Sequence, residues 1–161
     1  MSWLDPDGLL RKFGVEKATA NIAGEYRNVG QLREIELVLT LSGLTESETP
    51  VSDQVFFPKG ARIEEVRVTA HTAAATGTAI DLGLIKTDRS TEIDYNGLLA
   101  AFPTGSMDAD GETTTLNVGS TYAGALIGTT TTNPGYITCS RTTATAFTAG
   151  VVRIQIRYYM P

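Results

Sequence analysis

Strict alternation of apolar and polar residues is the main pattern in the chain. It begins at residue 33, and the apolar positions are Ile35, Leu37, Leu39 and Leu41. The positions between them include Glu34 and Glu36. Because neighbouring side chains of a strand point to opposite faces, this pattern predicts a half-buried strand at residues 33–41. One face of the resulting sheet is expected to be buried and the other wet.

The same period returns at residues 151–159. The apolar face there consists of Val152, Ile154, Ile156 and Tyr158. Arg153, Gln155 and Arg157 are expected to point outward. A second half-buried strand is therefore predicted at this end of the chain.

Further strands are predicted between these two, separated by Gly, Pro and Asn turns. Their ranges are 54–57, 61–72, 78–85, 113–118, 123–130 and 135–141. The adjacent Glu64 and Glu65 break the alternation, as a β-bulge does. Residues 95–102 fit either one short helix or an extended crossover. About eight strands at this spacing predict an all-β fold, a β-sandwich or jelly roll.

The first thirty residues lack a sustained period and are expected to form an extended N-terminal arm. Leu9, Leu10 and Phe13 fit one face of a single helical turn, although so short a helix is marginal in water. Trp3 and Leu4 are also apolar. The expected organisation is an arm at 1–30 and a β-sandwich (jelly-roll) domain at 31–161.

Length and charge narrow the function classes. At 161 residues the chain suits one domain, and its net charge of −5 without clustered Lys or Arg argues against a nucleic-acid partner. No apolar run is long enough for a membrane span, which needs about 20 residues. The start of the chain does not resemble a signal peptide. Synthesis in a cytoplasm, with no membrane partner, is therefore expected.

Candidate catalytic and metal-binding residues are few. The single histidine, His71, falls on the polar side of a predicted strand, where an ordinary exposed histidine is favoured over a general base. The single cysteine, Cys139, is expected to pack in a strand, and together the two supply too few ligands for zinc. We expect neither an enzyme nor a bound cofactor or metal.

Two other motifs have an ordinary structural explanation beside a functional one. The acidic residues Asp108, Asp110 and Glu112 resemble the opening of a calcium loop, but the threonine run after them favours a polar hairpin turn. A sugar-binding platform would use exposed aromatic side chains. Its candidates are Tyr122, Tyr136, Tyr158 and Tyr159, for which core or edge packing is favoured.

Several phrases of the sequence resemble those of capsid decoration (cement) proteins of tailed bacteriophages. These phrases are residues 54–63, 82–88, 119, 124–128 and 147–150. The resemblance implies a virion protein without enzymatic residues that binds the outer surface of the capsid. It further implies a homo-oligomer, dimer or trimer, that bridges adjacent major capsid protein subunits and is synthesised in the host cytoplasm.

The candidate contact residues follow from the two regions described above. Aromatic residues buried at an interface commonly carry much of its energy, so the arm supplies the predicted anchors. These are Trp3, Leu4, Leu9, Leu10 and Phe13. The alternative is an arm folded back on its own sandwich. Arg153 and Arg157 fit either contacts within an oligomer or a solvated face. The rival functions are a carbohydrate- or receptor-binding module of a phage tail and a small hydrolase built on His71.

Overall fold

The computed structural model describes residues 3–4, 10–11, 32–51 and 55–160. The chain divides into two compact units, Met1–Gly30 and Gln31–Pro161. Within the first unit, β1 (Trp3–Leu4) and β2 (Leu10–Arg11) form an antiparallel pair. The second unit is the β-rich body. Among the described residues, no helix is long and apolar enough to cross a membrane.

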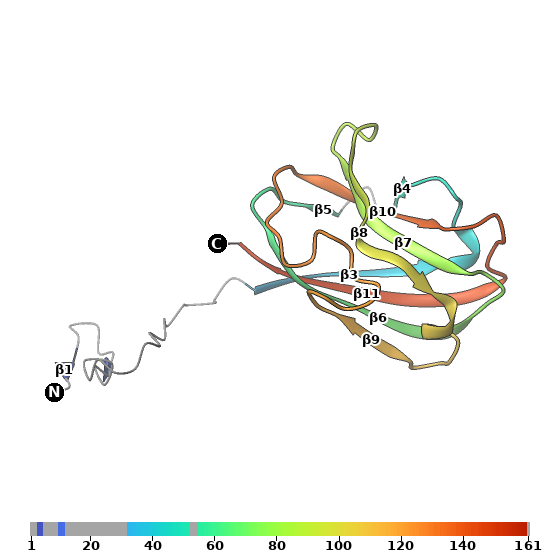
Figure 1. The fold of residues 1–161 in the computed structure, drawn as a ribbon, viewed down its shortest axis with the longest axis horizontal. Helices are drawn as coiled ribbons and strands as arrows, with labels where there is room; N and C mark the ends of the chain where they lie inside the picture. Colours follow the sequence, from blue (N-terminus) through green and yellow to red (C-terminus); the bar gives the residue numbers. More distant parts are fainter. Residues whose placement is uncertain (1–2, 5–9, 12–31, 52–54, 161) are drawn as a thin grey trace. The chain divides into compact units, whose positions relative to one another are not determined.

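The body consists of two antiparallel sheets (Figure 1). One has the order β3-β11-β6-β9, with bounds β3 (Leu32–Thr40), β11 (Ala149–Tyr159), β6 (Arg62–Ala75) and β9 (Thr113–Leu116). The other has the order β4-β10-β7-β8, with β5 also pairing with β10. Its bounds are β4 (Thr49–Pro50), β5 (Phe56–Phe57), β10 (Gly135–Arg141), β7 (Ala79–Lys86) and β8 (Glu92–Pro103). Two short 3-10 helices, η2 (Leu41–Gly43) and η3 (Thr104–Ser106), follow β3 and β8.

The order of the strands is that of a jelly roll. Both β4 and β5 pair with β10, so they occupy one strand position interrupted between them. In the described part of the body the first strand then pairs with the last, and the second with the one before the last. This wrapping of a long hairpin into two sheets is the double Greek-key arrangement. The predicted all-β sandwich is confirmed.

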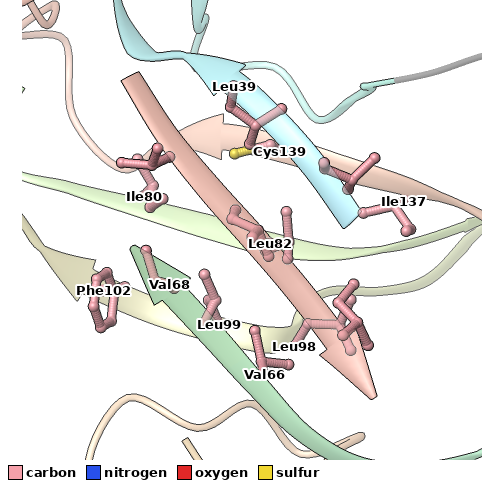
Figure 2. Packing of buried hydrophobic residues seen from close by; sticks show 14 of the residues in the cluster. Leu39, Val66, Val68, Ile80, Leu82, Leu98, Leu99, Phe102, Ile137 and Cys139 are labelled. Atoms are coloured by element: carbon pink, nitrogen blue, oxygen red, sulfur yellow. The ribbon is translucent and has the colours of Figure 1, made fainter. Parts of the chain in front are cut away.

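The core lies between the two sheets, where the alternating apolar residues meet. Figure 2 shows Val66 and Val68 of β6 on one side and Leu82 of β7 and Ile137 of β10 among those on the other. Side chains such as Ile154 of β11 are fully buried. Burial of each such aliphatic side chain contributes about 1.5–3 kcal/mol before entropy is counted. The core therefore fixes the register of both sheets.

The predicted bulge on β6 is present. Arg157 of β11 lies opposite Glu65, and the next residue, Tyr158, lies opposite Ile63. Glu64 is thus the extra residue of the bulge. In a regular strand, residues two apart point to the same face. Because Glu64 is left out of the pairing, Glu65 and Ile63 point to opposite faces.

One expectation about secondary structure is wrong, and one open alternative is decided. Residues 123–130 form turns and isolated bridges instead of a strand. Residues 95–102 lie in β8, so the extended alternative is correct and the helical one is wrong. In addition, the first predicted strand ends at Thr40, and the buried Leu41 begins η2.

Candidate protein-interaction surfaces

The outward face of the sheet β3-β11-β6-β9 carries rows of charged side chains. The register sets Glu34, Arg157 and Glu65 side by side on three neighbouring strands. Arg157 Nε lies 3.0 Å from Glu34 Oε2, and its Nη1 lies 3.0 Å from Glu65 Oε1. Gln155 Nε2 donates to Glu34 Oε1 at 2.9 Å and to Glu36 Oε2 at 3.3 Å. Charges on this face are therefore matched within the sheet.

This pairing of charges shifts the pKa values of Glu34 and Arg157. The hydrogen bond from Arg157 lowers the pKa of Glu34, against a smaller opposing effect of desolvation. The same bond, together with the nearby charge of Glu65, raises the pKa of Arg157. Because the side chains of Glu34 and Arg157 are 36% and 37% exposed, solvent screens the pair. It adds little to stability and mainly orients the side chains.

The two arginines singled out from the sequence lie together on this outward face of β11. Arg153 Nη1 is 4.0 Å from Glu36 Oε2, while Arg157 contacts Glu34. Both side chains are half-buried by their neighbours. Each arginine thus lies next to a glutamate of β3.

Three of the five candidate arm anchors lie in described strands. Trp3 and Leu4 form β1, and Leu10 lies in β2 opposite Leu4. A helical turn at Leu10 is therefore wrong, because extended pairing replaces it. Leu9 and Phe13 lie outside the described residues.

His71 is an exposed residue of β6. It lies at a register shift, since Thr72 is opposite Val151 while Ala70 is opposite Val152. Among the described residues no hydrogen bond joins its imidazole to a hydroxyl or a carboxylate. The interpretation of His71 as an exposed strand histidine agrees with this position.

Cys139 is a free thiol in the core, 1% exposed. Burial raises its pKa to about 12, with a smaller contribution from the charge of Asp81. Such a thiol is nearly always protonated at neutral pH and is a poor nucleophile. The predicted packing role of Cys139 is confirmed.

The acidic stretch at residues 108–112 connects two different sheets. The connection from β8 to β9 crosses the sandwich, so the expected hairpin turn is wrong. Asp110 Oδ1 accepts a hydrogen bond of 2.7 Å from Ala73 N, and Gly111 N donates to Ala70 O at 2.7 Å. Within the described part of the chain, no group of three or more His, Cys, Asp or Glu side chains could hold a metal ion. Asp110 ties this connection to β6.

The candidate tyrosines have different surroundings. Tyr158 is buried and packs against Phe57 at 4.7 Å between ring centroids. Tyr122 lies in the connection after β9, edge-on to Phe102. Tyr136 lies on β10 beneath the Arg89 guanidinium. Tyr158 is therefore unavailable to an exposed sugar-binding platform, and the other two lie on different elements.

Neither a protein-family model nor a curated protein matches this sequence. Solved structures do match it. A chain in the capsid of Ralstonia phage GP4 aligns with a TM-score of 0.55 and 14% identity, covering 89% of this chain and 93% of that one. A chain in the acidic stable capsid structure of Helicobacter pylori bacteriophage KHP30 aligns with a TM-score of 0.53 and 14% identity, covering 81% and 89%. The chain shares its fold with chains of phage capsids.

The jelly roll has one feature that the sequence did not predict, a connection that lines the edges of both sheets. Residues 122–126 run along the free edge of β8, where Gly124 N donates to Leu98 O at 3.2 Å and Leu126 N donates to Gly97 O at 2.8 Å. The region mistaken for a strand therefore protects an edge instead of adding a long strand.

The same connection continues along the other sheet. Gly128 N donates to Ile63 O at 2.7 Å, and Ile63 N donates to Thr129 O at 3.1 Å. Gly124 was the sequence signal for this close backbone approach, because a Cβ there would collide with the backbone of Gly97. Glycines inside an apparent strand mark such close backbone approaches.

Proposed function

We propose that this chain is a structural protein of a phage virion that binds the outer surface of the capsid. It acts as a homo-oligomer and stabilises the shell by bridging adjacent major capsid protein subunits. The observation that carries the proposal is the fold shared with the capsid chain of Ralstonia phage GP4. That alignment covers 89% of this chain and 93% of the other, so the likeness extends over nearly the whole of both.

The distribution of charge supports an outer position. The first thirty residues hold four acidic and four basic residues, so the whole net charge of −5 lies in residues 31–161. Four connections meet at the end of the sandwich away from Leu32 and Tyr159 (Figure 1). These connections, residues 41–48, 76–78, 104–112 and 142–148, contain five acidic residues and neither Lys nor Arg. Such an end repels nucleic acid and stays hydrated.

The arm, residues 1–30, carries no net charge and supplies the complementary function. In this proposal its anchors, among them Trp3 and Phe13, bury apolar side chains against capsid subunits. Each arm binds weakly by itself. Because several arms of one oligomer bind the same lattice, their combined affinity greatly exceeds that of one arm.

The test is sedimentation of the purified protein with phage heads that lack it. The test variant combines Trp3→Ala and Phe13→Ala in the full chain. The control is Val118→Ala, which trims a side chain that is 71% exposed on the body. Circular dichroism and thermal unfolding verify that each variant keeps the fold.

Saturable co-sedimentation of the unmodified chain and the control, lost in the double variant, is the expected result. Binding that survives in the double variant keeps the capsid function but removes the arm as its anchor. Absence of saturable binding to any head refutes the proposal and favours the carbohydrate- or receptor-binding module, which glycan-array binding would then test.

A further inference from the structure

Strand β3 presents a long open edge of the sandwich. It spans nine residues, and among the described residues it pairs only with β11, on one side. Among the described residues the other edges are short or lined: β4 and β5 have two residues each, β9 has four, and β8 is lined by residues 122–126. The backbone groups on the free side of β3 are thus a template for another strand.

Neither proline nor a bulge blunts this edge. The strand contains neither proline nor lysine, and its register with β11 runs through nine pairs without a bulge. Glu34 and Glu36 are held toward β11 by Gln155 and the arginines. Val38 is 62% exposed on the same outward face. Natural proteins usually protect such an edge with charge, proline or a bulge, so a partner strand is indicated.

We propose that the partner is a second copy of this chain, whose β3 pairs antiparallel with the first β3 about a twofold axis at Val38. The inference rests on the homo-oligomer proposed above and names its surface. The two four-stranded sheets then form one continuous sheet across both copies. This is strand addition at an exposed edge, with main-chain hydrogen bonds giving affinity and side chains giving register.

Side-chain chemistry selects this register. Centred on Val38, the pairing sets Val38 opposite its own mate and Leu37 opposite Leu39, so apolar residues face apolar ones. Glu36 then faces Thr40. No carboxylate lies directly opposite another, and Val38 loses its exposure to water.

The registers centred on residues 35, 36 and 37, which also keep the buried face continuous, are worse. Centring on Glu36 sets that residue opposite itself, and centring on Ile35 sets Glu34 opposite Glu36. Like charges directly opposite in a sheet are destabilising. Centring on Leu37 sets Val38 opposite Glu36, which pairs an apolar residue with a charge.

The chain offers a clean cross-linking test. Cys139 is the single cysteine and is 1% exposed, so Val38→Cys introduces the one accessible thiol. In the proposed pair the two new Cβ atoms lie about 4.5–5.5 Å apart, within reach of a short bifunctional thiol reagent. The matched control is Val118→Cys, at a position that is 71% exposed and lies on the β9–β10 connection.

A second variant tests the contact between the two β3 strands without cross-linking. In the proposed dimer, Val38→Lys sets two lysines opposite each other, next to Arg153 of each copy. Val118→Lys is the control. We measure mass by sedimentation equilibrium over a concentration series. The unmodified chain and Val118→Lys are expected at twice 17.2 kDa, and Val38→Lys at 17.2 kDa, with its dissociation constant raised at least tenfold.

The inference is supported if Val38→Cys cross-links rapidly, Val118→Cys does not, and Val38→Lys is monomeric. A monomeric unmodified chain overturns it, as does an oligomer whose mass Val38→Lys leaves unchanged. The inference is also overturned if the unmodified chain is monomeric without heads and Val38→Lys loses head binding. That result assigns the β3 edge to pairing with a capsid strand. Self-association is measured without heads, so its failure is distinguishable from failure of capsid binding.

Discussion

Substituting Gly83 by alanine tests how closely β8 passes over β7. The register between these strands jumps, since Leu82 is opposite Leu99 whereas Leu84 is opposite Asp94. A Cβ at Gly83 would approach the backbone of Asp94 and Tyr95 closer than 3.0 Å, a separation that real Cβ atoms essentially never show. Backbone cannot rotate away as a side chain does, so β8 must shift.

The magnitude follows from the cost of overpacking. Extra methyl groups in a tightly packed site cost about 1–3 kcal/mol, occasionally more. At roughly 2–4 °C per kcal/mol for a chain of this size, Gly83→Ala should lower Tm by about 2–12 °C. Urea unfolding should show a lower midpoint with an unchanged slope, because the denatured state is the same.

The matched control is Gly105→Ala in η3. A Cβ there meets nothing within 4 Å, and the backbone does not have a positive φ. Its stability should change by at most about 0.5 kcal/mol, the usual range of surface substitutions. Equal Tm values for the two variants, both close to the unmodified protein, would refute the close passage of β8 over β7.

Three further predictions concern individual groups. Cys139 should react with a maleimide at pH 8 only after unfolding, because its pKa is about 12 and it is buried; rapid labelling of the native protein would contradict this. The pKa of Glu34 by NMR titration should lie below 4.5 and rise toward 4.5 in Arg157→Gln, so its stabilisation holds above the unfolded pKa and is lost as pH falls through the folded one. An identical pKa in both proteins would exclude the pair. Ala101 has φ +48°, a conformation that costs an L-residue about 1–2 kcal/mol. In urea unfolding, Ala101→Gly should therefore leave stability unchanged or raise it by up to about 1 kcal/mol, whereas Ala100→Gly should lower it by about 0.5–1 kcal/mol. Equal losses in the two variants would refute the positive φ at Ala101.

The sequence predicts the strands that have one wet face. In β3, Leu37 and Leu39 alternate with charged or exposed positions, and in β11, Ile154 and Ile156 do the same. Their periodicity records burial on one side directly. The bulge at Glu64 was readable for the same reason, because it interrupts the period.

Segments whose environment is set by distant backbone were not readable. In residues 122–131 the buried positions are Gly124, Ile127 and Thr131, which follow no period of two. Their neighbours on β8 and β6 determine the conformation. In β8, Leu98 and Leu99 are both fully buried, so the local pattern resembled a helix while tertiary pairing imposed a strand.

For the candidate surfaces too, the direction of a side chain on one strand was predictable, and its contacts with other strands were not. The outward direction of Arg153 and Arg157 follows from alternation along one strand. Their pairing with Glu36 and Glu34 does not, because Arg157 and Glu34 are 123 positions apart and their contact requires the sheet order. The open edge of β3 likewise depends on knowing that nothing described pairs with its other side.

The position of β11 between β3 and β6 determines when this sheet can be made. Among the described strands, β11 is the last in chain order, yet it is the one that joins β3 to β6. A growing polypeptide therefore carries two half-apolar strands without their common neighbour until β11 leaves the ribosome. Folding dominated by such distant pairings is slow, on the order of milliseconds to seconds. Translation and assembly of this sheet are consequently successive events, and a chaperone has its opportunity in the interval between them.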